Sequence, residues 1–421
     1  MTTFFFGRTW EEFYNFLELI DNIDREVKKI IFVHNLSFEF QFLKSYFNIK
    51  DVFARKAHKV IKCMLEDFNI EFRCSYMMSN CALDKLTELY KLPVKKLKGN
   101  LDYNKIRTPI TKMTNEELAY CENDCLVVYY YILEELKIYE RVDKIPITST
   151  GHVRKELRDI VMNDYTYRNK VRKSINVEPH VYNLLIDCFA GGFTHANWLY
   201  AGDIIKNVTS YDFTSSYPYV LVTHRYPSSE FKKCNLKRIE QLNKNFAYII
   251  VVKFTNIRSK YFTSYISLSK CKNVSGGKYD NGRIIEAQEL EITLTDVDFR
   301  LIFEIYNIEK YEIIESYYST YNYLPKQFIE FVLQKYVNKT KYKGIKEKEL
   351  EYMKEKNKFN SLYGMSVTNT IRDNVIFNNE TKNWEELELT NKDIENELQE
   401  EKKKAFLSFS YRSLGNSLRK K

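Results

Sequence analysis

Long hydrophobic runs are absent from this sequence. The longest apolar run, residues 246–252, is far shorter than the ~20 residues that a membrane-spanning helix needs. The N-terminus also lacks a cationic flank followed by a long apolar region, which excludes a secretory signal peptide. We therefore expect no membrane partner for this chain.

Cysteine residues are few and scattered. The eight cysteines lack the pair-plus-pair spacing of a zinc site, and a chain of 421 residues does not need a disulfide scaffold. Cys121 and Cys125 lie four residues apart within a helical pattern, and we interpret them as reduced thiols of the core. This usage favours a cytoplasm as the compartment.

Positive charge and aromatic residues are abundant. The net charge is +9, and 33 tyrosines with 28 phenylalanines contribute to an aromatic share of 15%. A basic, aromatic-rich surface suits nucleic acid, because lysines neutralise phosphates and tyrosines stack on bases. An AT-rich genome would produce the same composition, so this alternative stays open.

The length and the patterning predict several domains. A hydrophobic content of 44% is enough for a sizeable core, and two to four domains are expected at about 150 residues each. Residues 1–145 alternate strand patterns (29–34 and 66–74) with helix patterns (35–46, and 115 to about 136 after a capping box at Thr114 and Glu117). This alternation predicts an α/β domain, followed by a linker at 146–151.

The remaining segments differ in pattern. We expect a glycine-bent turn at 189–193, a strand at 209–214, an irregular strand-rich region at 224–325 and lysine-rich helices at 327–364. Residues 368–401 are polar with an acidic run, and we interpret them as a solvated insertion.

One carboxylate stands at the end of the predicted strand, within the segment Tyr-Asp-Phe-Thr-Ser-Ser-Tyr-Pro at 211–218. Asp212 could simply cap the turn before Pro218. A strand end also presents a carboxylate rigidly to Mg²⁺, which takes few carboxylates and keeps water and substrate phosphates as its other ligands. Both interpretations stay open at this point.

A helical segment near residue 360 has an unusual polar face. Lys356, Asn360, Tyr363 and Gly364 share one side of a helix. Such a set makes a poor core face but suits a triphosphate and a flat base, because lysine meets phosphate, tyrosine packs on the base and glycine allows close approach. An ordinary lysine-rich helix would explain the lysines but not the other three residues.

Two polar pairs, each four residues apart on a predicted helix, form the third candidate: Asn35 with Glu39, and Tyr120 with Asp124. Carboxylates at helix ends that face one groove could hold two metal ions for phosphodiester hydrolysis. Each pair taken singly is also what a solvated helix face contains.

These segments resemble motifs of family B DNA polymerases. Asp212-x-x-Ser215-x-Tyr217-Pro218 is similar to motif A, and Lys356-x-x-x-Asn360-Ser361-x-Tyr363-Gly364 is similar to motif B. Phe189-x-Gly191-Gly192 resembles the Tyr-x-Gly-Gly element between the exonuclease and polymerase domains, with Phe in place of Tyr. Residues 35–39 resemble the second exonuclease motif, with Glu where Asp is commoner, and Tyr120-x-x-x-Asp124 resembles the third. The order and spacing fit the protein-primed branch of phages, linear plasmids and organelles.

The resemblance implies an α/β fold: an incomplete ribonuclease-H-like 3′–5′ exonuclease domain, then a family B palm with fingers and insertion segments. Residues 1–145 would form the exonuclease-like domain, 146–223 the linker and palm with motif A, and 224–326 an insertion with palm strands. Residues 327–367 would be the fingers with motif B, 368–402 a second insertion and 403–421 the start of a palm helix. The implied function is template-directed DNA synthesis in replication.

The resemblance also implies site residues, a cofactor and partners. Asp212, Lys356 and Tyr217 would be catalytic; Ser215, Ser216, Asn360, Tyr363 and Gly364 would bind nucleotide; His34, Phe38, Gly191 and Gly192 would bind DNA. Asn35, Glu39, Tyr120, Asp124 and Lys98 would form the exonuclease-like site. Mg²⁺ would be held, in an incomplete two-metal arrangement, by Asp212, Glu39 and Asp124. The implied partners are primer–template DNA, dNTPs, a terminal protein primer and a second polymerase chain that carries motif C.

Two elements of the family pattern are missing from the sequence. No Asp-x-Glu motif precedes residue 6 and no Asp-Thr-Asp of motif C follows the second insertion, so the chain resembles a polymerase truncated at both ends. We interpret the tail after Tyr411 as a frameshift, with a split gene or an intron boundary as the alternative. We expect little polymerase activity of the isolated chain; an inactive DNA-binding fragment or one chain of a split polymerase is the alternative function. For a phage protein the compartment would be the bacterial host cytoplasm.

Overall fold

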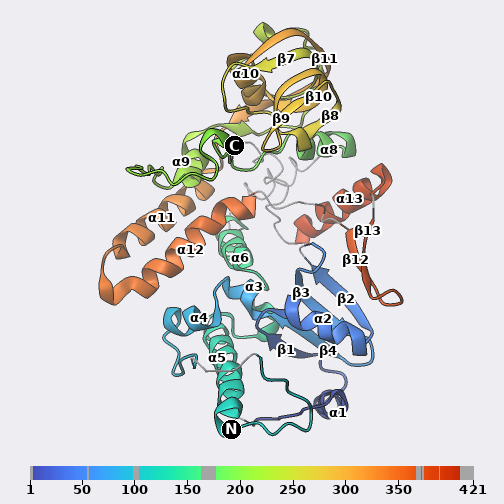
Figure 1. Cartoon of the computed structure of the whole chain (residues 1–421), viewed down its shortest axis with the longest axis vertical. Coiled ribbons are helices and arrows are strands. Elements are labelled where there is room, and N and C mark those ends of the chain that lie inside the picture. Colours follow the sequence, from blue (N-terminus) through green and yellow to red (C-terminus); the bar gives the residue numbers. More distant parts are fainter. Residues whose placement is uncertain are drawn as a thin grey trace. The chain divides into compact units, whose positions relative to one another are not determined.

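The computed structural model describes residues 3–54, 56–97, 104–162, 177–366, 371, 374–387 and 389–407. The chain divides into two compact units, each assembled from separate stretches. The first comprises Met1–Glu156, Gln334–Ser361 and Asp373–Glu388, and the second comprises Leu157–Leu333, Leu362–Arg372 and Leu389–Lys421. Figure 1 labels the helices and strands of both units along the chain.

A four-stranded sheet with the order β1-β4-β3-β2 forms the centre of the first unit. Its strands are β1 (Lys29–Val33), β2 (Ile49–Ala54), β3 (Val60–Leu65) and β4 (Ile70–Cys74). β1 and β4 run parallel, and the other neighbours run antiparallel. The strand expected over 66–74 is confirmed for 70–74, which form β4, and is wrong for 66–69, which bend between β3 and β4; these two strands pair as a hairpin.

Helix α2 (Leu36–Tyr46) follows β1 and confirms the helix expected there. It buries Leu36, Phe40 and Leu43 in the same core as the strands of this sheet. Because these positions are three and four residues apart, they share one helix face, and the opposite face is left for polar and exposed aromatic residues.

The other helices of the first unit are α1 (Trp10–Asp21), α3 (Ser75–Ser79), α4 (Leu83–Leu89), α5 (Asn115–Tyr139) and most of α6 (Ser149–Met162) and α12 (Glu349–Ser366). The capping box expected at the start of α5 is confirmed. The Glu117 backbone amide donates to the Thr114 hydroxyl over 3.2 Å, and the Thr114 amide donates to the Glu117 carboxylate over 2.9 Å. These bonds satisfy amides that a helix start otherwise leaves unpaired.

The hairpin of β12 (Asn374–Asn378) and β13 (Asn383–Leu387) also belongs to the first unit. Its Phe377 is 7% exposed and packs on Phe40 of α2, with ring centroids 5.0 Å apart. The Asn379 side chain exchanges hydrogen bonds of 2.8 and 2.7 Å with the backbone of Ile49 in β2. The interpretation of this stretch as a solvated insertion is therefore wrong for the hairpin, because two of its side chains dock it on the sheet unit.

A seven-stranded antiparallel sheet forms the centre of the second unit, with the main order β5-β11-β7-β10-β8. The strands are β5 (Tyr226–Pro227), β6 (Lys232–Cys234), β7 (Phe246–Ser259), β8 (Cys271–Ser275), β9 (Lys278–Asp280), β10 (Arg283–Thr295) and β11 (Tyr306–Asn322). The expected richness in strands is confirmed, but the expected irregularity is wrong, since β7, β10 and β11 are long and pair almost continuously. Helix α10 (Asp296–Ile305) buries Phe299 and Ile302 in the core of this sheet.

The remaining helices of the second unit are α8 (Pro179–Asp187), α9 (Ser216–Thr223), α13 (Asn391–Leu407) and the first half of α11 (Lys326–Tyr342). The short 3₁₀ turns η1 to η5 cover Val142–Lys144, Trp198–Tyr200, Ile239–Gln241, Leu268–Lys270 and Lys346–Lys348. No helix in the described part of the chain combines the length and the apolarity needed to cross a membrane.

Candidate nucleotide and nucleic-acid site

The segment that carries Asp212 is extended and exposed rather than a strand. Residues 209–213 have no assigned secondary structure, and 214–215 form a turn, so the strand expected at 209–214 is wrong. Tyr211 and Phe213 are 91% and 86% exposed. A strand needs a hydrogen-bonded neighbour, and no described residue pairs with this segment. Ser215, in the left-handed region at φ 56°, then turns the chain into α9.

Three residues from separate motifs meet in the second unit. The rings of Tyr217, in the first turn of α9, and Tyr363, in the last turn of α12, are stacked with centroids 4.1 Å apart. A Cβ at Gly192 would lie 3.2 Å from the Tyr217 hydroxyl, so this glycine closely approaches the same ring. Burial, and then the charge of Tyr217, raises the pKa of the Tyr363 phenol. The structure therefore brings together residues that the sequence assigned to motif A, motif B and the Gly-Gly turn.

Helix α12 presents the polar face expected from its sequence. Phe359 and Leu362 are buried at 1% and 0% exposure, whereas Asn360 is exposed and Lys356 is half-buried. Asn360 therefore lies on the exposed side of α12, whereas Tyr363 lies near the buried Phe359 and stacks on Tyr217.

The turn at 189–193 is flanked by two cations that the sequence did not single out. The Arg283 guanidinium lies 4.9 Å from the ring centroid of Phe193, and Lys270 Nζ lies 6.0 Å from that of Phe189. Gly191 is exposed and has open space where a Cβ would stand. A cavity of about 220 Å³ lies beside this turn and is lined by both glycines and both cations. Lys270 and Arg283 are far from the turn in sequence, so only folding reveals them.

The two polar pairs of the predicted exonuclease-like site lie on α2 and α5 of the first unit. Asn35 is the N-cap of α2, with a left-handed φ of 68°, and Glu39 is in the first turn. On α5, Asp124 Oδ2 lies 3.9 Å from Lys96 Nζ, which is also 6.0 Å from the ring centroid of Tyr120. Lys96 thus contacts both residues of the predicted pair on α5, and the sequence reasoning missed it because it sits in a lysine-rich run that looks like a solvated loop.

The pKa shifts connect these two motifs through the same lysine. Burial, and then the positive charge of Lys96, lowers the pKa of His34 to about 4. Burial raises the pKa of Asp124, and Lys96 partly offsets that rise. Burial raises the pKa of Glu39 as well. The positive charge of Lys96 therefore acts both on His34, which precedes α2, and on Asp124 of α5.

The structure also bears on the other residues that the sequence singled out in this unit. Cys121 and Cys125 are exposed, so their interpretation as core thiols is wrong; they lie on the outward side of α5, whose inward side buries Val127 and Tyr131. Phe38 is 57% exposed and contacts Phe42, which leaves it accessible to a base. The predicted Lys98 lies outside the described residues. Within the described ranges, no three His, Cys, Asp or Glu residues are grouped to hold a metal ion.

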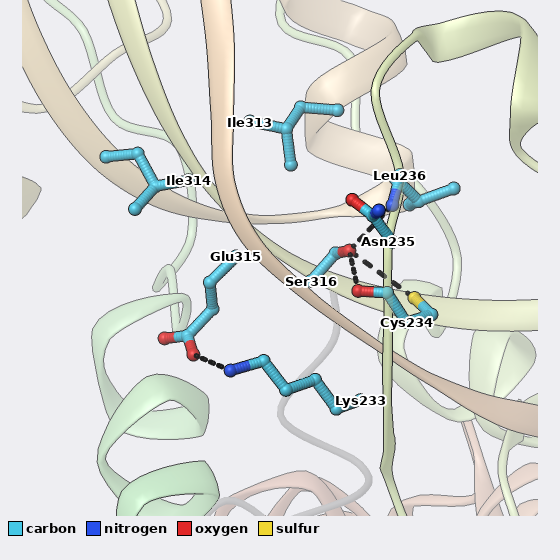
Figure 2. Close-up of a pocket in the computed structure, with 8 residues that line it drawn as sticks. All are labelled: Lys233, Cys234, Asn235, Leu236, Ile313, Ile314, Glu315 and Ser316. Carbon is cyan, nitrogen blue, oxygen red and sulfur yellow. Dashed lines mark hydrogen bonds and ion pairs between the residues drawn. The ribbon is translucent and has the colours of Figure 1, made fainter.

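A second cavity, of about 380 Å³, lies between β6 and β11 in the second unit and contains none of the predicted site residues. Figure 2 shows Glu315 directed toward Lys233, and the Ser316 hydroxyl directed toward Cys234 and Leu236. Beside this cavity, a β-bulge between Ile313 and Glu315 shifts the pairing of β11 with β7. Glu315 and Ser316 are thus engaged in contacts with other protein groups, which favours a structural role for this groove.

The chain belongs to the organellar and viral family of type B DNA polymerases, whose family model matches residues 97–417. Among curated relatives it is 22% identical over 367 residues to the DNA polymerase of Bacillus phage B103 and 23% identical over 366 residues to that of Bacillus phage Nf. Each match covers 82% of this chain and 60% of the relative. The chain thus spans about 60% of the length of these relatives.

Solved structures of Phi29 DNA polymerase have the same fold. The complex with single-stranded DNA matches with a TM-score of 0.64 and 19% identity over 87% of this chain and 63% of that chain. The ternary complex with primer–template DNA and incoming nucleotide matches with a TM-score of 0.62 and 19% identity over 91% of this chain and 66% of that chain. The family membership and the family B fold implied by the motifs are therefore confirmed.

Proposed function

We propose that this chain binds primer–template DNA and a complementary dNTP and takes part in template-directed DNA synthesis. The observation that carries the proposal is the meeting of Gly192, Tyr217 and Tyr363, because three motifs that are far apart in sequence converge on one pair of stacked rings. The relatives and the fold support the same reaction class.

Each residue has a role that follows from its chemistry. The Lys356 ammonium neutralises the triphosphate, Asn360 and Tyr363 line the pocket of the new base pair, and Tyr217 packs under the sugar. Gly191 and Gly192 let the backbone approach the template, and Ser215 and Ser216 flank the triphosphate. The primer 3′-hydroxyl attacks the α-phosphate in line, a new P–O bond forms and pyrophosphate leaves.

Asp212 is the carboxylate that we propose as a Mg²⁺ ligand at this site. It is exposed, three residues before Ser215, the N-cap of α9, and a single carboxylate that leaves room for water and phosphate oxygens suits Mg²⁺. When bound, the ion would supply charge neutralisation at the transferring phosphoryl group. The residues themselves hold and orient the nucleotide.

The first unit is proposed to bind a single-stranded DNA end. His34, Asn35, Phe38 and Glu39 from the start of α2 would face it together with Tyr120 and Asp124 of α5. Lys96 would contribute a cation to the phosphates. A terminal protein primer, a second polymerase chain, Mg²⁺ ligation by Glu39 and Asp124, and the cytoplasm of a host stay predictions.

Nucleotide binding to a complex of the chain with primer–template DNA tests the proposal. We expect the dNTP complementary to the templating base to bind about tenfold or more tightly than a mismatched one. Lys356→Ala should weaken this binding by about tenfold, the value of a charge-assisted contact. We expect little primer extension by the isolated chain in the presence of Mg²⁺, and whatever extension occurs should be lost in Asp212→Ala.

The matched control is Lys346→Ala, which removes an exposed lysine from the turn before α12 and should leave the affinity unchanged. Binding that ignores the templating base, or that is equal in Lys356→Ala and the parent chain, would refute the proposal.

A further inference from the structure

Helix α12 has two opposite faces with different partners. At about 100° per residue, Lys354, Glu355 and Lys358 share one side of the helix. The side about half a turn away carries Lys356 and Asn360. The charged residues of the first side contact other parts of the first unit, and those of the second side are the candidates for nucleotide contact.

An ion-pair cluster joins the first side to helices α6 and α11. Lys335 of α11 is buried, with a side chain only 4% exposed, and pairs with Glu156 of α6. Lys335 Nζ also lies 3.9 Å from Glu355, and Lys358 Nζ lies 3.5 Å from Glu156. Two acids and two lysines therefore alternate across three helices, all within the first unit. A buried lysine that loses an acid partner keeps its desolvation cost, so this cluster is sensitive to single substitutions.

A second contact extends the attachment to the helices before α6. Lys354 Nζ lies 4.1 Å above the ring centroid of Tyr90, and the Tyr90 hydroxyl donates to the buried Glu135 of α5 over 3.1 Å. Burial raises the pKa of Glu135, and the Tyr90 hydrogen bond and the charge of Lys354 lower it in part. Lys354 thus compensates a carboxylate in the interior of the exonuclease-like unit.

We propose that Glu156 and Lys335 are positioning residues that hold α12 against α6 and α11 so that Lys356 and Asn360 face the incoming nucleotide. The inference rests on the proposed function for the nucleotide role of these two residues. It goes beyond that function because it makes Glu156 of α6 and the buried Lys335 of α11 determinants of nucleotide affinity, although neither residue touches the nucleotide. Lys335 contacts Glu355 and Glu156 contacts Lys358, so the two residues fix the rotation of α12 about its axis. This rotation sets the direction in which Lys356 and Asn360 point.

Two measurements on the full chain test the proposal. Hydrogen exchange in the absence of nucleotide should become faster for amides 349–361 in Glu156→Gln. The affinity of the primer–template complex for the complementary dNTP should fall by about fivefold to tenfold, while the affinity for DNA changes by less than about twofold. The double variant with Glu156→Lys and Lys335→Glu should not recover the nucleotide affinity, because it restores the pair between α6 and α11 but places like charges against Lys358 and Glu355 of α12.

The control variant is Glu88→Gln, which removes the acid of an exposed pair with Lys85 and should alter neither measurement. Unchanged exchange in α12 together with unchanged dNTP affinity in Glu156→Gln would overturn the inference. Equal loss of DNA and dNTP affinity would also overturn it, because that indicates general unfolding. If the parent chain binds no dNTP but Glu156→Gln still loosens α12, the proposed function fails and the anchoring of α12 stands.

Discussion

Tyr217 and Tyr363 stack with ring centroids 4.1 Å apart and planes inclined by 23°. A stacked aromatic pair contributes about 0.5–1.5 kcal/mol beyond the area it buries, so each ring restricts the rotation of the other. Since one ring belongs to α9 and the other to α12, the stack fixes the position of the first motif relative to the end of the second. A phenol held in this way has a defined plane on which a sugar can rest.

Tyr217→Val should weaken the discrimination between deoxyribonucleotides and ribonucleotides. In the role that we propose for Tyr217, the fixed ring would occupy the space that a ribose 2′-hydroxyl needs, and valine would vacate it. We expect the ratio of dNTP to rNTP affinity, measured on the primer–template complex, to fall about tenfold or more. Tyr219→Val, at a 62% exposed tyrosine of the same helix, is the control and should keep the parent ratio. A ratio that is unchanged in Tyr217→Val would contradict the role given to this ring.

Gly192→Ala should disturb the same ring from the other side. The added Cβ would stand 3.2 Å from the Tyr217 hydroxyl, and because this contact is tight, the ring must shift to accommodate it. We expect a loss of dNTP affinity of about threefold to tenfold, corresponding to an overpacking cost of about 1 kcal/mol. The measurement is the dNTP titration of the primer–template complex.

Two variants separate this contact from a general effect of losing glycine. Gly191→Ala places its Cβ in open space and should bind dNTP as the parent chain does. Tyr217→Phe removes the hydroxyl that the new Cβ meets, so combining it with Gly192→Ala should restore affinity to the level of Tyr217→Phe alone. If Gly191→Ala is as damaging as Gly192→Ala, the contact with Tyr217 is not the cause.

Local sequence signals predicted the helices of this fold well. They failed where the structure depends on contacts between residues that are distant along the chain. The apolar spacing of α2, the capping box of α5 and the polar face of α12 depend on residues a few positions apart, and the structure confirms all three. The strand expected around Asp212 failed because alternation forms a strand only beside a partner. The docking of Phe377 was not predicted either, because the segment around it is polar and one buried ring changes its average hydrophobicity very little.

The candidate site shows the same division. Tyr217 and Tyr363 were both singled out by motif spacing, but nothing in the sequence states that their rings touch. Lys96 was missed because a lysine-rich run looks like a solvated loop, and Lys270 and Arg283 were missed because a single cation in a basic chain carries no local signal. Their partners are brought close only by the packing of helices and strands that are distant along the chain.

Glu71 should make the stability of the first unit depend on pH. Its carboxylate is fully buried in β4, with Lys28 Nζ at 2.9 Å and Lys62 Nζ at 3.4 Å, and it is also paired with Arg73. Burial would raise the pKa of Glu71, but the hydrogen bonds of Lys28 and Arg73 and the charges of Arg73 and Lys62 lower it to about 2.

The direction of this pH dependence follows from the lowered pKa of Glu71. In the unfolded chain Glu71 titrates near its ordinary value of 4.5, so the stabilisation is complete above that pH and is lost as the pH falls toward 2. The difference is worth about 3 kcal/mol of unfolding free energy. Denaturant unfolding of the parent chain and of Glu71→Gln should therefore differ at pH 7 and converge at low pH. A constant difference across that range would contradict the prediction, and Glu88→Gln should show no difference from the parent.

Asn379→Ala should release the β12–β13 hairpin from the edge of β2. The asparagine side chain both accepts from and donates to the Ile49 backbone, as a neighbouring strand would, and its loss leaves both groups unpaired. We expect a local cost of about 1–2 kcal/mol, seen as faster hydrogen exchange of the hairpin amides at unchanged global stability. Asn383→Ala, at an exposed position of β13, is the control; equal protection in the two variants would refute the anchoring role.

Lys96→Ala should weaken the binding of single-stranded DNA to the chain. Lys96 Nζ lies 3.9 Å from Asp124 Oδ2. Its charge helps to lower the pKa of His34 and offsets part of the rise that burial causes in the pKa of Asp124, so we place its ammonium at the predicted exonuclease-like site. A lysine that neutralises one phosphate contributes about one unit to the slope of log affinity against log salt concentration. Titration of a labelled oligonucleotide at several salt concentrations should therefore give a lower affinity and a slope smaller by about one unit than in the parent chain. Lys95→Ala is the matched control, because its side chain is exposed one residue earlier in the same lysine run. If both variants reduce the slope equally, Lys96 acts only through the general charge of the run, and its assignment to the site is wrong.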